Sequence, residues 1–422
     1  LEAMAHGLDE EVRLVPMLER LGRDMKIPIV ATNDSHYTSR GDAGAHDVLL
    51  CIQTGRTVKD KSGLCFSSDQ FWFKTREEMR HAFGREDWLD NTLMVADQCD
   101  LRIETGVVHM PRFSGLPEGR TAPEMLRELV AQGLPQRYNP ITEEVRQRAE
   151  YELEVIIGKH YADYFLIVWD LSRWAHERGI PLSFRGSAGS SVVAYAIGIH
   201  DLDPIALNLV FERFLNPERD DPPDIDLDVP DDTRGEIIRY AVERYGADRV
   251  AQVVTFGTLQ GRAAVRDTGR ALDVPLAEVD RLAKLIPSMA TIDEGLEAQA
   301  ELRQLYQTDT RVAELIDNAR AIEGLIRHAS THAAALVIAH KPLSELTPLM
   351  RHANDETITT QYSMDALKKI GVEKLDLLGL KTLTVLRNTL MWIERTTGQK
   401  VKLDEVPPDD PETFASLSRG ET

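Results

Sequence analysis

Long segments of the chain space their apolar residues as a helix does, and short apolar runs separate these segments. Residues 10–25 place apolar side chains on one helical face, and Pro28 follows soon after them. Residues 143–179 carry the longest such pattern, which we expect to break near Gly158. Further helices are predicted over residues 88–99, 190–197, 204–219, 230–250 and 276–326, after Gly257, and from Lys381 onward.

The short apolar runs predict strands, because they have strand length and are rich in β-branched residues. Gly257 is expected to form a turn after one of these strands, and Gly379 to end another. Strands mixed with long helices predict an α/β (α+β) fold. The predicted strands cover residues 29–31, 70–75, 224–228, 252–255, 335–339 and 372–377.

The strand at residues 224–228 alternates acidic and apolar side chains. Alternate residues of a strand share a face, so Asp224, Asp226 and Asp228 would point the same way. Carboxylates gathered on one face repel one another unless cations lie between them. Mg²⁺ prefers such hard oxygen ligands. The alternative is a solvated acidic turn following Pro222-Pro223.

A turn of small residues, RGSAGSS at 185–191, precedes this acidic strand. Its backbone N–H groups and hydroxyls are suited to binding phosphate, although such turns are common and the motif alone is weak. A phosphate-binding turn combined with metal-binding carboxylates is the minimum set of groups for phosphoryl or nucleotidyl transfer. The strand at 372–377 adds Lys374 and Asp376 on one face, and a sheet could place Asp376 beside Asp226.

Two further groups of side chains are candidates for binding. Asp34 and His36 follow the strand at 29–31, the position at which α/β barrels carry metal ligands, although a helix cap and a packed histidine explain them too. Arginines four residues apart share one face of the helix after Gly257 and could follow a DNA backbone, while a solvated charged face explains them equally well. These arginines are Arg262, Arg266 and Arg270.

Composition limits the class of protein without deciding its function. The 422 residues, 42% of them hydrophobic, suffice for two to four domains, and no apolar run is long enough to span a membrane. The three cysteines have no zinc-site spacing and suit a reducing cytoplasm. A net charge of −20 does not indicate a nucleic-acid binder, yet a local basic groove would suffice to bind DNA. Both ends of the sequence look cut, which we interpret as an internal piece of a longer protein.

The segments RGSAGSSVVAYAIGIHDLDP, FERFLNPER, PDIDLD, VTFGT and EKLDLLGL resemble the bacterial DNA polymerase III alpha subunits, the family C polymerases. ATNDSHY and HDVLLCIQTG resemble the last part of the polymerase and histidinol phosphatase (PHP) domain of the same family. The resemblance implies a nucleotidyltransferase-type palm with a mixed β-sheet, an inserted helical thumb and the end of a PHP α/β barrel. The implied domains are the PHP end at 1–112, the palm at 113–255 and 329–385, the thumb at 256–328, and the start of the fingers at 386–422.

The same resemblance implies the roles of site residues. Asp226, Asp228 and Asp376 would be catalytic and hold two Mg²⁺ ions, with no catalytic role for Asp224. Incoming nucleotide would be bound by Arg185, Gly186, Ser187 and Lys374. The thumb arginines would contact DNA, and Asp34 and His36 would form part of a PHP site for Zn²⁺ or Mn²⁺.

The implied activity is that of a DNA-directed DNA polymerase in chromosomal replication. Its partners would be primer-template DNA and dNTPs, with the sliding clamp and other replisome subunits binding the longer protein and no membrane involved. The piece itself is expected not to extend a primer processively, because it barely enters the fingers. The alternatives are a PHP-type phosphoesterase or a non-catalytic scaffold, and, within the family, an error-prone paralogue in place of the main replicase. Two departures from the family pattern, Phe184 before the turn and Val229-Pro230 after the acidic strand, leave the subfamily open.

Overall fold

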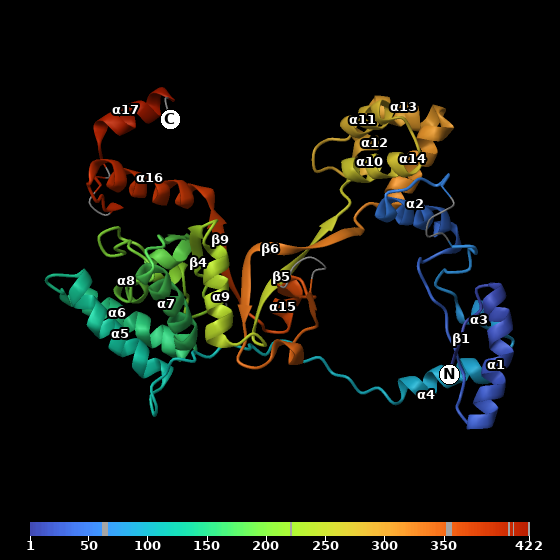
Figure 1. Cartoon of the computed structure of the whole chain (residues 1–422), viewed down its shortest axis with the longest axis horizontal. Coiled ribbons are helices and arrows are strands. Elements are labelled where there is room, and N and C mark those ends of the chain that lie inside the picture. Colours follow the sequence, from blue (N-terminus) through green and yellow to red (C-terminus); the bar gives the residue numbers. More distant parts are fainter. Residues whose placement is uncertain (61–65, 220–221, 352–356, 404–405, 408, 421–422) are drawn as a thin grey trace. The chain divides into compact units, whose positions relative to one another are not determined.

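The computed structural model describes residues 1–60, 66–219, 222–351, 357–403, 406–407 and 409–420. It divides into two compact units (Figure 1). The first unit combines residues 1–103 with 256–330, and the second combines 104–255 with 331–422. Each unit is therefore assembled from segments that lie far apart in the sequence.

The first unit is mostly helical. Its two short strands, β1 (Glu2–Ala3) and β2 (Val30–Ala31), pair in parallel. Helix α2 (Ala43–Thr54) packs against α10 (Gly261–Ala271) and α14 (Thr310–Ile322), so the two segments of this unit share one apolar core. The other helices are α1 (Asp9–Met25), α3 (Arg76–Phe83), α4 (Glu86–Ala96), α11 (Leu276–Leu285), α12 (Ile292–Ala298) and α13 (Ala300–Thr308).

A mixed seven-stranded sheet organises the second unit, with the order β3-β4-β9-β6-β5-β8-β7. The β4–β9 and β5–β8 pairs are parallel, whereas β3–β4, β6–β9 and β7–β8 are antiparallel. Strands that lie far apart in the sequence, such as β4 and β9, thus become neighbours in the sheet. The strands are β3 (Ser183–Arg185), β4 (Asp226–Pro230), β5 (Val250–Thr258), β6 (Ile326–Ile338), β7 (Leu349–Arg351), β8 (Ile358–Thr360) and β9 (Lys374–Leu380).

Helices pack beside the β4 end of this sheet (Figure 1). The central one, α7 (Ala162–Glu177), buries most of its residues, and its last two residues are exposed. The chain leaves β9 directly into α16, so this helix begins where the strand ends. The helices of this unit are α5 (Ala122–Arg137), α6 (Glu143–Gly158), α7, α8 (Val192–Ala196), α9 (Arg234–Tyr245), α15 (Met364–Lys369), α16 (Lys381–Thr397) and α17 (Pro411–Arg419).

Helices α5 and α8 meet at a glycine. A Cβ atom added to Gly133 would lie 1.9 Å from the carbonyl oxygen of Ala196, far inside contact distance. Only a residue without a side chain allows the two helices to approach so closely. This contact fixes the position of α8 against α5.

Most predicted helices are confirmed, including the break between α6 and α7 near Gly158 and the start of α16 at Lys381. Four predictions of local structure are wrong. Residues 204–219 form turns and one short 3₁₀ segment at Phe211–Arg213, and residues 70–75 contribute only the single bridge between Tyr37 and Trp72. The strands β5 and β9 continue through Gly257 and Gly379.

The two glycines lie within strands because neighbouring atoms approach them closely. A Cβ atom on Gly257 would lie 2.7 Å from the ring of His328, and one on Gly379 would lie 3.1 Å from the Cα of Asp231. A glycine within a strand often marks such a close approach. Among the described residues, no helix combines the length and the apolar character needed to cross a bilayer.

Candidate active site

Two aspartates from distant segments lie opposite each other in the sheet. Parallel pairing of β4 with β9 sets Asp226 in register with Asp376. Neighbouring strands lie about 4.8 Å apart, so two carboxylates in register on one face are close enough to share a cation. The predicted juxtaposition of Asp226 and Asp376 is therefore present.

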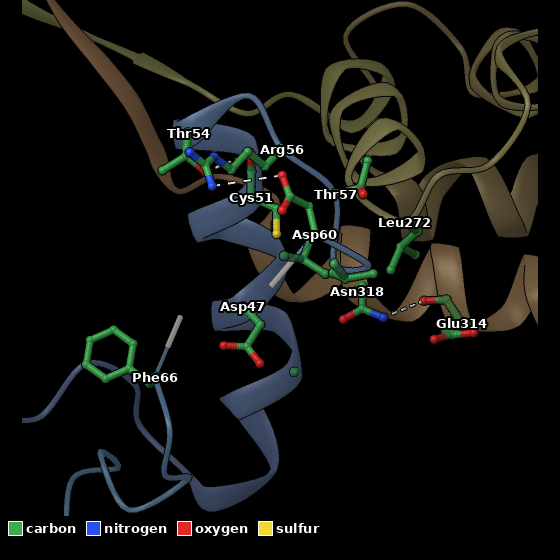
Figure 2. Close-up of a pocket in the computed structure, with 13 residues that line it drawn as sticks. Asp47, Cys51, Thr54, Arg56, Thr57, Asp60, Phe66, Leu272, Glu314 and Asn318 are labelled. Atoms are coloured by element: carbon green, nitrogen blue, oxygen red, sulfur yellow. Dashed lines mark hydrogen bonds and ion pairs between the residues drawn. The ribbon is translucent and has the colours of Figure 1, made fainter. Parts of the chain in front are cut away.

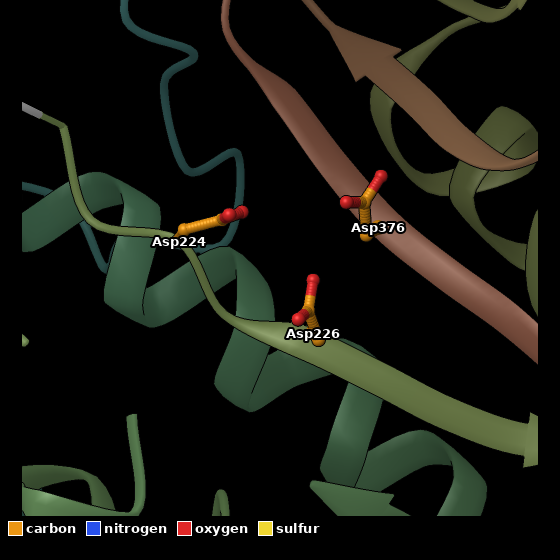
Figure 3. A group of neighbouring side chains, drawn as sticks. All are labelled: Asp224, Asp226 and Asp376. Carbon is orange, nitrogen blue, oxygen red and sulfur yellow. The ribbon is translucent and has the colours of Figure 1, made fainter. Parts of the chain in front are cut away.

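Asp224 joins this pair (Figure 3). It lies just before β4, and its carboxylate points into the space that Asp226 and Asp376 face. One carboxylate oxygen from each of the three lies within 4.8 Å of the other two. We refer to these three residues as the carboxylate group. Alternation along the strand predicted that Asp224 shares a face with Asp226, but the family resemblance gave the catalytic roles to Asp226, Asp228 and Asp376 and none to Asp224.

Asp228 lies outside the carboxylate group. Its side chain is buried, and its carboxylate accepts two hydrogen bonds from Arg185, one of them 2.7 Å long from Nη2 to Oδ1. Antiparallel pairing of β3 with β4 brings the two residues together. A bidentate arginine is a strong partner for a buried carboxylate. The immediate partner of Asp228 is thus the guanidinium of Arg185. The predicted convergence of Asp228 with Asp226 and Asp376 is not seen in the structure.

The electrostatics of the carboxylate group favour a bound cation. Burial raises the pKa of Asp226, and the negative charges of Asp224 and Asp376 raise it further. The Nζ atom of Lys374 lies 3.3 Å from Asp224 Oδ1 and also contacts Asp376. Burial opposes the charge on Lys374, but hydrogen bonding to Asp376 and attraction to Asp224 outweigh it and raise the pKa of this lysine.

The carboxylate group meets the requirements of a divalent metal site. Its donors are hard carboxylate oxygens, the type that Mg²⁺ and Mn²⁺ prefer. Asp376 Oδ1 is buried and accepts no hydrogen bond from the described residues. A buried oxygen without a partner is costly, and a metal ion coordinated there would remove that cost.

The turn of small residues lies next to the carboxylate group. After β3 the chain forms a 3₁₀ segment, Gly186–Ser190, and then enters α8. Gly186 has φ of 81°, a conformation that favours glycine, and a Cβ atom on it would lie 3.8 Å from Asp226 Oδ2. The predicted helix from residue 190 to 197 is shorter, because Ser191 caps α8 by accepting a hydrogen bond from Ala194 N.

Residues 124–379 match the family described as the bacterial DNA polymerase III alpha NTPase domain. The chain belongs to this family. It is 40% identical over 425 residues to the DNA polymerase III subunit alpha of Borreliella burgdorferi, covering 100% of this chain and 37% of that protein. The subunit alpha of Thermus aquaticus is 39% identical over 488 residues, covering 100% and 40%. That of Bacillus subtilis is 40% identical over 407 residues, covering 96% and 36%. The chain thus spans between 36% and 40% of the length of these relatives.

In this member of the polymerase III alpha family, sequence reasoning missed two groups that support the site. The Tyr164 hydroxyl on α7 accepts a 3.2 Å hydrogen bond from Ile225 N and holds the chain between Asp224 and Asp226. Glu152 on α6 is buried behind the turn and accepts hydrogen bonds from it. The tyrosine lies within an apolar stripe and the glutamate among several charged residues of one helix, so neither stands out by type or spacing.

The three predicted DNA-binding arginines make contacts within the first unit. Arg262 Nε donates a 2.7 Å hydrogen bond to Ile286 O, and Arg266 Nε one of 2.8 Å to Asp280 Oδ1. Arg270 Nη1 lies 3.1 Å from Asp267 Oδ1 and keeps an exposed side chain. The first two contacts attach α10 to α11 and its C-terminal end, and the third lies within α10. A role in DNA binding stays a prediction of the family resemblance.

Asp34 and His36 follow β2 as predicted and pair with each other. His36 Nε2 lies 3.1 Å from Asp34 Oδ2, and the Asp34 backbone N–H donates to His6 Nε2. Neither side chain belongs to a set of three potential ligands among the residues that the structure describes. The partial PHP metal site therefore stays a prediction. Cys65, included in the cysteine count, lies outside the described residues.

A cavity of about 480 Å³ opens in the first unit between α2 and α14 (Figure 2). Its acidic residues are Asp47 on α2, Asp60 and Glu314, beside the apolar Phe66 and Leu272. These carboxylates do not form a set of three potential ligands within the described part of the chain. The cavity thus lacks the convergence that marks the carboxylate group.

Proposed function

We propose that this chain carries the catalytic centre of a DNA-directed DNA polymerase, which adds dNTPs to a primer 3′-hydroxyl in chromosomal replication. One observation carries the proposal: the in-register pair Asp226 and Asp376 lies beside the Gly186 turn in a chain of the polymerase III alpha family. Carboxylates for metal and a turn for phosphate are the groups that nucleotidyl transfer requires.

The proposed catalytic carboxylates are Asp226, Asp228 and Asp376, which would hold two Mg²⁺ ions once Arg185 turns from Asp228 toward the triphosphate. When bound, such ions lower the pKa of the attacking hydroxyl and stabilise negative charge on the phosphates. Asp226 and Asp376 orient this site from two adjacent strands, and Asp228 shares the strand with Asp226. Arg185, which neutralises Asp228, could instead face the triphosphate, a second use for its exposed guanidinium.

The turn and Lys374 provide positive potential for the nucleotide. Backbone N–H groups at Gly186 and Ser187 would bind the phosphates of the incoming dNTP. Lys374 places an ammonium group between Asp224 and Asp376, where it would balance charge near the triphosphate or the primer terminus. With metal held by the carboxylates, no side chain would be needed as a general base.

The domain assignments extend this proposal. Residues 113–255 and 329–385 would form the palm, 256–328 the thumb, 1–112 the end of the PHP domain and 386–422 the start of the fingers. The partners would be primer-template DNA, dNTPs and, for the longer protein, the sliding clamp. Bacterial chromosomes lie in the cytoplasm, and we place the parent protein there.

Primer extension by the full-length parent tests the proposal. We expect Asp376→Ala to abolish extension while DNA affinity, titrated at fixed salt, changes little, because the loss is of metal binding and not of the DNA-binding surface. Asp365→Ala, an acidic residue of α15 outside the carboxylate group, is the matched control. Extension by Asp376→Ala at the parental rate would contradict the assignment.

A further inference from the structure

A buried glutamate lies behind the turn that is proposed to bind phosphate. Glu152 on α6 has a fully buried side chain, and its carboxylate accepts three hydrogen bonds from the chain just after the turn. Oε1 accepts from Val192 N at 3.0 Å, and Oε2 accepts from Val193 N at 3.0 Å and from Ser191 Oγ at 2.8 Å. The first N–H groups of α8 are therefore already bound to a protein carboxylate.

Arg148, one helical turn before Glu152, holds the other side of the same junction. Its Nε donates to Glu152 Oε1 at 2.8 Å, and its Nη2 donates to the carbonyl oxygens of Ser190 and Leu209 at 3.0 and 3.1 Å. A single ion pair thus binds the last carbonyl of the 3₁₀ segment and the N–H groups that follow it. Such charge-assisted hydrogen bonds are about twice as strong as neutral ones.

The five-residue 3₁₀ segment is held at both of its ends. Pairing of β3 with β4 sets Arg185, just before Gly186, opposite Asp226, and Arg148 holds Ser190 at the other end. Since the N–H groups of α8 are bound to Glu152, phosphate must bind at the Gly186 end. The conformation of the segment between its two ends, and with it the direction of its N–H groups, depends on where Ser190 is held.

We propose that Glu152 and Arg148 are positioning residues, which set the orientation of the nucleotide-binding turn toward the catalytic carboxylates. This inference rests on the proposed polymerase function. Neither side chain contacts substrate; both act through the turn. A displacement of the turn by about 1 Å is expected to lower kcat/KM for the dNTP by up to about 100-fold, because phosphoryl transfer depends on alignment.

Steady-state primer extension by the full-length parent, with dNTP concentration varied, tests the inference. Glu152→Gln keeps the shape of the side chain but replaces one acceptor oxygen by an NH₂ group. Because both oxygens of Glu152 accept hydrogen bonds, this NH₂ group would face other donors. We expect KM for dNTP to rise about 10- to 100-fold, with a smaller change in kcat. The matched control is Glu150→Gln on the exposed face of α6, where Glu150 pairs with Arg127, and its KM should equal that of the parent.

A milder variant covers the case in which Glu152→Gln fails to fold. Ser191→Ala removes one of the three hydrogen bonds to Glu152 and also the side-chain cap of α8. We expect a rise in KM of several-fold with a thermal melting midpoint lower by only about 2–4 °C. If Glu152 only stabilises the fold, its variants lose active protein, so that kcat falls with KM unchanged, and the inference is wrong.

Asp226→Asn separates failure of the inference from failure of the proposed function. If Asp226→Asn is inactive while both Glu152→Gln and Ser191→Ala keep the parental KM, only the positioning role is overturned. If Asp226→Asn extends primers at the parental rate, the polymerase site itself is wrong and the inference fails with it.

Discussion

The two units place their acidic candidates in different surroundings. In the second unit, Asp224, Asp226 and Asp376 converge from two strands and a preceding loop, and one buried oxygen of Asp376 accepts no hydrogen bond from the described residues. In the first unit, Asp34 and His36 lie two residues apart on one loop and pair with each other at 3.1 Å. The first arrangement gathers three carboxylates around the single ammonium group of Lys374, whereas in the second the two candidate ligands contact each other.

The difference shows what sheet register contributes to a site. Residues close in sequence can satisfy each other, as Asp34 and His36 do. Residues brought together by β4 and β9 are held by backbone hydrogen bonds that their own repulsion does not break. A metal ion is therefore needed more by the carboxylate group than by the Asp34–His36 pair.

The largest effect is expected at Asp226. Asp226→Asn in the full-length parent should lower primer extension by about 10³-fold or more, by analogy with the loss of one electrostatic group from a preorganised site. Asp224→Asn should cost less, about 10-fold, because the Asp224 side chain is 58% exposed and water screens its charge. Primer extension at saturating dNTP measures both. Equal losses would show that the loop before β4 contributes as much as the strand.

A buried histidine of the second unit should make the stability of the protein depend on pH. Burial lowers the pKa of His200, in the second unit, from the ordinary 6.5 to about 4. Between these two values His200 is protonated in the unfolded state and neutral in the native state. The free energy of unfolding therefore falls as pH drops from about 6.5 to about 4. The full shift corresponds to about 3 kcal/mol. Thermal melting of the parent and of His200→Leu across this range should show a larger loss in the parent. Parallel curves would mean that His200 is not the titrating group.

Much of the fold follows from the sequence, because helical periodicity and short apolar runs are local signals. The pair Asp226 and Asp376 was predicted through the family resemblance, and the strand register now explains its geometry. Alternation placed Asp224 on the face of Asp226, and the family resemblance then set it aside. The contacts of Glu152 were not predictable, since they depend on where α6 lies in space. Gly257 and Gly379 misled the prediction because each glycine serves tertiary packing and not a turn.

Replacing a helical glycine should change the free energy of unfolding in opposite directions in the two units. A Cβ atom on Gly133 of α5 would lie 1.9 Å from Ala196 O, whereas one on Gly44 of α2 meets nothing within 4 Å. Gly133→Ala should lower the free energy of unfolding by about 1–3 kcal/mol through overpacking. Gly44→Ala should raise it by about 0.5–1 kcal/mol, since alanine favours the helix. Denaturant unfolding measures both, and a stable Gly133→Ala would show that α8 is free to move away from α5.

The smallest effect is expected at the Asp34–His36 pair. Its side chains are 54% and 35% exposed, and an ion pair this accessible to water contributes about 0–1 kcal/mol. Asp34→Asn in the full-length parent should therefore leave both primer extension and the melting midpoint close to parental values. The same preparation should also be tested for Mn²⁺ binding by calorimetry, in parallel with Asp226→Asn. Loss of bound Mn²⁺ in Asp34→Asn would show that residues outside this chain complete a metal site around the pair. Loss in Asp226→Asn alone would leave the carboxylate group as the metal site, because among the described residues it is the one set of three carboxylates that converge.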